Sequence, residues 1–163
     1  MDRSTLTDAE LAFLRPSRTA VLATQDTGGR PRLVPICFVV APELDERGRL
    51  VLHTPIDEKP KQSDDPRQLQ RIQDLLILPE VTLLVDRWAE DWSKLAWLRL
   101  YGRGEILEPE PREVEEHAAA IAALREKYEQ YRTHRLEERP IIRLTIERVR
   151  SWGAIEDPAP PTS

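Results

Sequence analysis

The segment Asp57-Glu58-Lys59-Pro60-Lys61 carries the most suggestive pattern of charged side chains in this sequence. It places the ammonium groups of Lys59 and Lys61 two residues apart, and Pro60 stiffens the backbone between them. Two lysines so placed could hold one phosphate group. The alternative is a solvated turn, because the acidic neighbours nearly balance the basic ones. Composition alone favours the turn.

Two further groups of residues could contribute to a binding site. Arg71 lies in a segment with helical spacing, where its guanidinium could return to the same anion or point to water. Trp88, Trp92 and Trp97 are followed by Arg99. Aromatic faces beside a cation suit the stacking of a flat ring system, and equally a hydrophobic dimer contact. Both interpretations predict that this stretch lies at an interface.

Signatures of several enzyme classes are missing. The sequence has no P-loop, no dinucleotide-binding glycine fingerprint and no Gly-x-Ser-x-Gly motif. His53, His117 and His134 lack partners at metal-ligand spacing, so no metal site is predicted. Cys37 has no second cysteine to pair with, and its apolar neighbours favour a packed thiol over a catalytic one. The residue pattern identifies no catalytic residue.

Length and composition limit the setting in which these residues can act. The chain has 163 residues, 40% hydrophobic and 33% charged, which fits one globular domain. A net charge of −5 argues against nucleic-acid binding. The N-terminus lacks an apolar signal core and the longest apolar runs cannot cross a bilayer, so we expect a cytoplasmic protein with no membrane partner. The domain is placed at residues 1–156 and a disordered Pro-rich tail at 157–163.

Hydrophobic periodicity predicts about six strands and three helices. The first helix begins at a capping box formed by Thr7 and Glu10 and ends at Pro16. Apolar residues at helical spacing predict two more helices, over residues 68–78 and 111–131. Strands are predicted over residues 19–25, 32–40, 49–54, 81–87, 95–106 and 141–149.

Turn and breaker residues indicate how these strands connect. Gly28-Gly29 tolerates the positive φ of a tight hairpin. Pro35 has no N–H and marks a sheet edge, a bulge or a ligand wall. Gly102 and Gly104 interrupt a long strand where it could bend sharply. Because the strands do not alternate with helices, a small antiparallel barrel is favoured over a parallel sheet, and the predicted fold class is mainly β (α+β).

Several short sequence blocks occur in a fixed order along the chain. They are Leu22-Ala23-Thr24, Gly29-Arg30-Pro31, Leu33-Val34-Pro35, Lys59-Pro60-Lys61, Leu83-Leu84-Val85-Asp86, Asp91-Trp92, Trp97-Leu98-Arg99 and Arg148-Val149-Arg150-Ser151-Trp152. In order and approximate spacing, this series resembles the pyridoxamine-phosphate-oxidase-like split β-barrel superfamily, and within it the class of probable F420-dependent oxidoreductases. The sequence departs from the pattern of these relatives at Asp74 and Leu78, where they tend to carry Asn, and at Trp88, where Tyr is common.

The resemblance implies a six-stranded antiparallel split barrel and a tight homodimer with two cofactor sites at the subunit interface. In this pattern the basic residues after the third strand hold the cofactor phosphate, and Thr24 and the following strand line its ring system. Aromatic and basic residues reach the ring from the partner subunit. The cofactor-binding residues so implied are Thr24, Val34, Pro35, Ile36, Lys59, Pro60, Lys61, Arg71, Trp97, Arg99 and Trp152.

The function implied by the resemblance is hydride transfer between coenzyme F420, a deazaflavin, and an unidentified small organic substrate. Two alternatives stay open. One is an FMN-dependent oxidoreductase that uses the same phosphate site, and the other is a non-catalytic carrier of flavin, F420 or haem, with His53 or His134 as a haem ligand. Lys94, Arg99 and Arg103 could serve the glutamate tail of F420 without being diagnostic.

Overall fold

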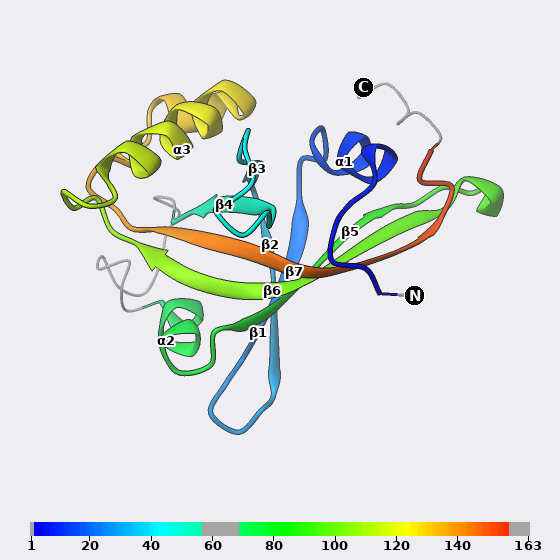
Figure 1. The fold of residues 1–163 in the computed structure, drawn as a ribbon, viewed down its shortest axis with the longest axis horizontal. Coiled ribbons are helices and arrows are strands. Elements are labelled where there is room, and N and C mark those ends of the chain that lie inside the picture. The colour runs from blue at the N-terminus through cyan, green and yellow to red at the C-terminus, as the bar shows by residue number, and fades with distance from the viewer. Residues whose placement is uncertain (1, 57–68, 157–163) are drawn as a thin grey trace.

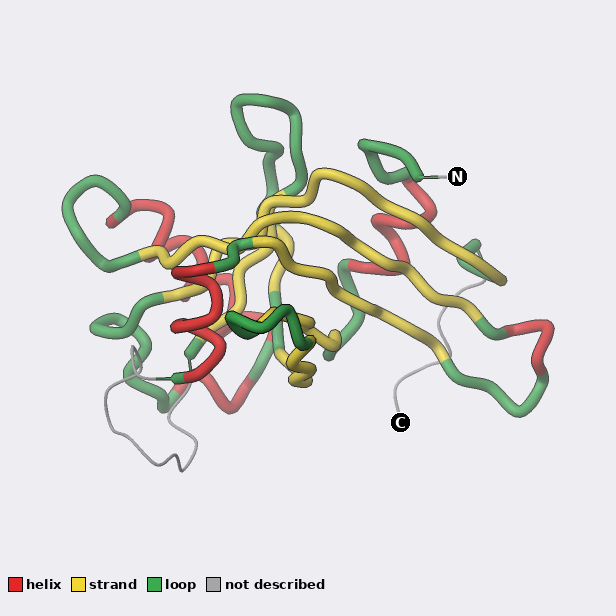
Figure 2. The backbone as a smooth tube through the Cα atoms, turned by 90° about the horizontal axis from the view of Figure 1, so that it is seen from below, coloured by secondary structure: helices red, strands yellow, loops and turns green. Residues whose placement is uncertain are grey.

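A computed structural model describes residues 2–56 and 69–156, and the strands in this part of the chain form one antiparallel sheet. The strand order is β2-β1-β5-β6-β7-β4-β3, and the sheet is strongly curled (Figures 1 and 2). The strands are β1 (Ala20–Gln25), β2 (Pro31–Ile36), β3 (Val39–Val40), β4 (Val51–Pro55), β5 (Glu80–Arg87), β6 (Ala96–Leu107) and β7 (Ile141–Gly153).

In the described part of the chain, three α-helices and two short 3₁₀ turns accompany the sheet. The helices are α1 (Asp8–Leu14), α2 (Gln70–Ile77) and α3 (Val114–Lys127), and the turns are η2 (Trp92–Lys94) and η3 (Glu129–Arg132). The capping box predicted for α1 is confirmed, because Glu10 N–H donates to Thr7 Oγ1 (3.2 Å) and Thr7 N–H donates to Glu10 Oε2 (2.9 Å). The predicted curled α+β fold is likewise confirmed.

The predicted strand count of six is wrong, because residues 32–40 form two strands and not one. β2 ends at Ile36 and β3 begins at Val39, and these two strands lie at opposite edges of the sheet. At the break, Phe38 N–H donates to the Tyr128 hydroxyl, which lies just beyond α3 (3.0 Å). Only two residues join the two edges, so the sheet must curl until its edges approach each other.

The main hydrophobic core lies on the inner side of the curl. One cross-strand row on this side runs through Leu22, Leu83, Leu100 and Val149, all fully or almost fully buried. α1 and α2 pack against the same core, through Leu14 of α1 and through Ile72 and Leu75 of α2. The inner side of the sheet therefore has no room for a ligand beside these residues.

The bend predicted at Gly102 is confirmed by a register shift between β6 and β7 at Tyr101/Gly102. A Cβ on Gly102 would lie 2.0 Å from the backbone oxygen of Thr145, so only glycine allows the two strands to approach so closely. Gly104 has a different role, because a Cβ there would lie 2.7 Å from Leu75 Cδ2. It makes space for α2 against the sheet.

The outer side of β6 and β7 is divided into two parts. At one end, α3 packs over the strands and buries Val39, Leu107 and Ile141 in a second, smaller core with its own Ile121 and Leu124 (Figure 1). We call this part the covered half. At the other end no described helix is packed, because α1 and α2 lie on the inner side and α3 on the covered half. We call this part the open half.

Cross-strand pairing defines the members of the open half, because directly paired residues point to the same side of a sheet. Its three rows are Asp86-Trp97-Trp152, Pro35-Val21-Leu84-Arg99-Arg150 and Leu33-Ala23-Thr82-Tyr101-Arg148, written across the neighbouring strands.

Candidate functional site

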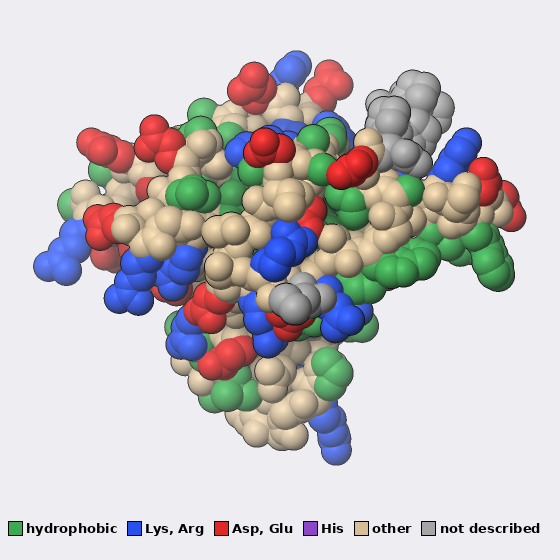
Figure 3. Space-filling model, turned by 45° about the vertical axis from the view of Figure 1, so that its right-hand side comes forward, with side chains coloured by type: hydrophobic (Ala, Val, Ile, Leu, Met, Phe, Trp, Pro, Cys, Tyr) green, Lys and Arg blue, Asp and Glu red, His purple; other side chains and the backbone are tan. Residues whose placement is uncertain are grey.

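The open half carries two tryptophans and three arginines on neighbouring strands. Trp97 of β6 is paired with Trp152 of β7, and Arg99 is paired with Arg150 one row further along. Paired side chains in an antiparallel ladder lie about 4.5–5.5 Å apart at their Cβ atoms. Trp152 is 52% exposed and Leu33, on β2 of the same side, is 69% exposed. Hydrophobic side chains also gather at the outstretched end of the sheet, on the right of Figure 3.

Two of these arginines lie on aromatic rings. The Arg99 guanidinium carbon is 4.7 Å from the centre of the Trp97 ring, and Arg99 Nη1 donates to the Tyr101 hydroxyl (3.2 Å). The Arg148 guanidinium carbon is 4.3 Å from the centre of the Tyr101 ring, and Arg148 forms an ion pair with Asp2 (3.2 Å). Cation–π contacts of this kind hold the guanidinium in place without neutralising its charge. Arg99 can therefore still attract an anion, whereas the charge of Arg148 is partly balanced by Asp2.

An open groove adjoins this row of aromatic and basic residues. Its volume is about 730 Å³, within the ~300–1,000 Å³ that small-molecule sites commonly have. Ala23 and Thr24 of β1, Thr82 of β5, Tyr101 of β6 and Arg148 of β7 contribute to its walls. The groove could hold part of an organic molecule whose flat portion lies against the open half.

A polar cluster lies under α2 near the same end of β1. The buried Thr24 donates its hydroxyl to Asp74 Oδ2 (3.4 Å), and Arg32 Nε forms an ion pair with that oxygen (2.8 Å). Gln70 Nε2 donates to the other carboxylate oxygen (3.0 Å). Asp74 is 4% exposed, and the exposed Arg32 balances its charge from the surface. The predicted site residue Arg71 lies half-buried on the same helix, one turn before Asp74.

The structure separates the predicted site residues into distinct environments. Trp97, Arg99, Trp152 and Pro35 all belong to the open half. Val34 and Ile36 lie on the inner side, where Ile36 is 6% exposed in the core and Val34 packs against it. The three predicted residues of this strand therefore do not share one surface, because successive side chains of a strand point to opposite sides.

The predicted phosphate anchor lies outside the described residues. Lys59, Pro60 and Lys61 fall in the segment 57–68, between the end of β4 and the start of α2. Their role therefore stays a prediction. The tail at residues 157–163, expected to be disordered, also lies outside the described part of the chain.

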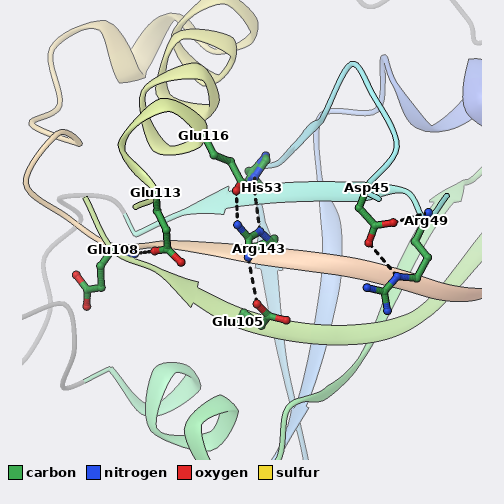
Figure 4. A network of polar contacts seen from close by, with 8 residues as sticks. All are labelled: Asp45, Arg49, His53, Glu105, Glu108, Glu113, Glu116 and Arg143. Atoms are coloured by element: carbon green, nitrogen blue, oxygen red, sulfur yellow. Dashed lines mark hydrogen bonds and ion pairs between the residues drawn. The ribbon is translucent and has the colours of Figure 1, made fainter. Parts of the chain in front are cut away.

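The covered half contains a charged network that sequence reasoning missed (Figure 4). Glu116 points from α3 to the strands, where His53 Nε2 lies 2.9 Å from its Oε1 and Arg143 Nε donates to the same oxygen (2.7 Å). A second Arg143 nitrogen binds Glu116 Oε2, and Arg143 Nη1 also donates to Glu105 (3.1 Å). The hydrogen bonds from Arg143 hold the pKa of Glu116 at about 2, and burial lowers the pKa of His53. Glu116 is therefore ionised and His53 neutral at pH 7.

A second cavity, of about 670 Å³, lies beside this network. It is bounded by α3, by β3 and β4 with their connecting loop 41–50, and by β7. Only the pairing of His53 with Arg143 across β4 and β7 could have been found from a strand alignment. Glu116 could not, because its position depends on how α3 is laid across the sheet.

The described residues contain neither a membrane-spanning helix nor a metal-binding cluster. No described helix is both long and apolar enough to span a membrane. In the ranges 2–56 and 69–156, no three histidine, cysteine or acidic side chains converge as they would around a metal ion.

The chain matches one protein-family model and a set of solved structures. The model, described as pyridoxamine 5'-phosphate oxidase, covers residues 6–153. A conserved hypothetical protein from Mycobacterium tuberculosis has a similar structure, with a TM-score of 0.67 and 24% identity over 98% of this chain and 92% of the other. No curated protein matches the sequence significantly.

Two further structural relatives have descriptions that name a cofactor. An FAD-binding protein from Mesorhizobium loti has a TM-score of 0.61 and 18% identity over 93% of this chain and 96% of its own. A haem storage protein from Vibrio cholerae has a TM-score of 0.59 and 18% identity over 91% of this chain and 94% of its own. At these identities the likeness shows the shared fold alone.

Proposed function

The chain belongs to the pyridoxamine 5'-phosphate oxidase family, and from this premise we propose that it is a homodimeric oxidoreductase that binds the deazaflavin coenzyme F420 on the open half of its sheet. A flavin-type cofactor suits the family, and proteins of the same fold include an FAD-binding protein. The choice of F420 over FMN rests on the arginines described next.

The observation that carries this proposal is the combination of aromatic and cationic side chains on the open half. A flat, conjugated ring requires an apolar surface, which Trp97 and Trp152 provide side by side. An anionic cofactor chain requires positive charge, which Arg99, Arg148 and Arg150 provide in adjacent rows. Arg150 is exposed and forms no ion pair with a described residue. The residues present therefore fit a flat ring with an anionic chain.

The distribution of positive charge favours an extended anion. A single phosphate can be held by one or two basic residues, whereas these three arginines are spread over two strands and two rows. F420 carries a phosphodiester and a tail of glutamates, and its several negative charges match such a spread. Lys59 and Lys61 are proposed to hold the phosphate end, and Arg71 to lie near them.

When bound, F420 would supply hydride transfer to or from a small organic substrate. The residues of this chain would bind and orient the cofactor, and they would exclude water from its ring. Trp97 and Trp152 would form one wall, and the arginines would fix the position of the anionic chain. This division of labour agrees with a sequence whose residue pattern identifies no catalytic residue.

A second copy of the chain is the proposed cover for the open half. Leu33, Trp88, Trp92 and Trp152 are each at least 52% exposed. Leu33 and Trp152 belong to the open half, and Trp88 and Trp92 lie in the connection between β5 and β6. Large apolar side chains left exposed in this number are typical of an interaction surface. A twofold dimer that buried them would enclose two cofactor sites between its subunits, as in the sequence resemblance.

The direct test is a side-by-side titration of the full-length protein with F420, FMN and haemin. The proposal expects saturable F420 binding at least tenfold tighter than that of FMN. The Arg150→Gln variant should weaken F420 binding by about tenfold, because one charge-assisted contact is lost. Arg47→Gln, at an exposed arginine on the loop between β3 and β4, is the matched control and should bind F420 like the wild type. Protein that retains FMN on purification, or that binds only haemin, would overturn the choice of F420.

The phosphate anchor is tested separately. Lys61→Ala is expected to weaken F420 binding by about tenfold or more, because an ammonium contact to the phosphate contributes ~1.5–3 kcal/mol. Fluorescence titration measures the affinity, and circular dichroism checks that the fold is intact. If a folded Lys61→Ala protein bound F420 as tightly as the wild type, the phosphate role of Lys61 would be refuted. The Arg150→Gln result would not be affected.

A further inference from the structure

The cavity under α3 has a shape set by small side chains. Ala119, Ala120 and Ala123 line it, and together with Glu116 they occupy one face of the helix at spacings of three, four and seven residues. Alanines on this face leave space between α3 and the strands that larger side chains would fill. Val39 and Val51 belong to the apolar part of the wall. The result is the volume of about 670 Å³.

The polar end of the cavity is formed by a buried histidine that has one ring nitrogen in a hydrogen bond. His53 is 4% exposed and lines the cavity, and its Nε2 lies 2.9 Å from Glu116 Oε1. An ionised carboxylate can only accept a hydrogen bond, so the ring proton must be on Nε2. Nδ1 then carries a lone pair, and no described residue donates a hydrogen bond to it. Glu116 is itself held by Arg143, so the ring orientation is fixed (Figure 4).

The charges around the cavity indicate which kind of molecule would donate this hydrogen bond. Five acidic side chains but only three arginines line it. Arg143 is paired with Glu116 and Glu105, and Arg49 is paired with Asp45 (2.9 Å). Glu43 and Glu46, on the loop at the rim, form no ion pair with a described residue, and Arg47 is the remaining cation. The rim therefore favours a positively charged guest over an anion.

We propose that this cavity is a binding site for a small aliphatic amine, whose N–H group donates to Nδ1 of His53 while its alkyl part lies against Val39, Val51 and the alanines of α3. Nδ1 accepts no hydrogen bond from a described residue, and an amine in the cavity supplies a donor for it. A carboxylate guest would meet a lone pair and an acidic rim, and an alcohol would gain nothing from the rim charge. The site is on the covered half and does not depend on the cofactor proposal.

The experiment uses the full-length protein and four probes of similar size. These are 1,4-diaminobutane, n-butylamine, 1-butanol and butyrate, titrated by isothermal calorimetry and by amide chemical shifts. Both amines should bind saturably, with shifts confined to α3, β4 and the loop 41–50. Butanol and butyrate should bind at least tenfold more weakly. Absence of saturable amine binding, or preferential binding of butyrate, would overturn the proposal.

Two kinds of variant locate the amine. Ala119→Leu fills the cavity without removing a polar group and should abolish binding, whereas Ala122→Leu, on the exposed face of the same helix, is the matched control. His53→Leu should weaken amine binding by about tenfold. Amine binding equal to that of the wild type in a folded Ala119→Leu protein would overturn the site even if His53→Leu were to misfold.

The role of the rim charges is tested with two double variants that change the net charge by the same amount. Glu43→Gln combined with Glu46→Gln should weaken amine binding several-fold and make it less sensitive to salt. Glu80→Gln combined with Glu147→Gln makes the same charge change beside the other groove and should leave amine binding unchanged. Equal effects of the two double variants would mean that net charge alone attracts the amine, which would overturn the assigned rim.

Discussion

The covered and open halves of the sheet are made by the same two strands and differ in what lies against them. On the covered half, Leu107 and Ile141 are paired across β6 and β7 and are at most 1% exposed under α3. On the open half, Trp97 and Trp152 are paired in the same way, yet Trp152 is 52% exposed. The alternation of side chains along a strand gives the sheet two sides, but it does not determine which element packs against each side. One half is completed within the chain, and the other is left for a ligand or a second copy.

The two halves also treat their arginines differently. Arg143 on the covered half is bound by two carboxylates, so its charge is neutralised where it lies. Arg99 on the open half lies over Trp97 and donates to a hydroxyl, and Arg150 forms no ion pair with a described residue. The paired Arg143 fastens α3 to the strands, whereas Arg99 on its aromatic ring remains available to an anion.

The largest effect is expected where α3 meets the strands. Leu124→Ala should lower the free energy of unfolding by about 2–5 kcal/mol, because Leu124 is fully buried and the change leaves a cavity. Leu76→Ala, at a side chain 66% exposed on α2, is the control and should change it by less than about 0.5 kcal/mol. Urea denaturation measures both. Equal, small effects would mean that α3 does not stabilise the covered half.

A substitution on the open half should weaken dimerisation and leave the stability of the fold unchanged. Trp152→Ala is expected to weaken dimerisation by about 30-fold, or ~2 kcal/mol, as large aromatic residues at interface centres commonly do. Sedimentation velocity over a range of concentrations measures the dissociation constant. Leu44→Ala, at a side chain 57% exposed on the β3–β4 loop, serves as the control. A monomeric wild type, or a Trp152→Ala dimer as tight as the wild type, would contradict the assignment of this face.

The ion pair of the covered half should contribute less than its hydrophobic core. Glu116→Gln keeps the size of the side chain and removes its charge, leaving Arg143 with a weaker acceptor. Because the Glu116 side chain is 34% exposed, solvent screens part of this loss. We expect the free energy of unfolding to fall by about 1–2 kcal/mol in denaturant titrations. Arg150→Gln on the open half should leave it unchanged, and the reverse order would break the contrast between the two halves.

The smallest effect on the free energy of unfolding is expected from a change of pH. Burial lowers the pKa of His53 below its usual 6.5, against opposing hydrogen bonding from Glu116 and with Arg143 and His117 nearby. The unfolded chain therefore takes up the proton first as the pH falls. The stability contributed by neutral His53 is complete above about pH 6.5 and is lost between that pH and the lower folded pKa. His53→Leu should lack this decrease in urea titrations from pH 7.5 to 5. Parallel curves for the two proteins would refute it.

Local sequence signals predicted most of the elements. The capping box at Thr7 and Glu10, the hairpin glycines and the alternating residues of β7 act within one element or between close neighbours, so they could be recognised without a structure. The division of residues 32–40 into two strands could not be recognised from such local signals. The break at Phe38 depends on the Tyr128 hydroxyl, 90 residues away in sequence.

The candidate site was predicted in part. The Trp97 and Arg99 stretch was singled out by its residue types. The structure adds Tyr101, two residues further along the same strand, and Arg148 and Arg150, which only strand pairing brings beside it. The strand 33–36 was predicted to line one site, yet its side chains are divided between the core and the open half. Asp74 was recognised only as a departure from the pattern of relatives, and its pairing with Arg32 required the packing of α2.

The sequence by itself determined the family, the alternation of the strands and the types of residue available for binding, because these depend on order and short-range periodicity. The tertiary structure decided which surfaces are buried and which charges are paired. α3 packs across one half of the sheet, so that Glu116 reaches His53 and Arg143. The other half has exposed aromatic rings. Such contacts join residues far apart in the chain, and only the curl of the sheet and the docking of the helices bring them together.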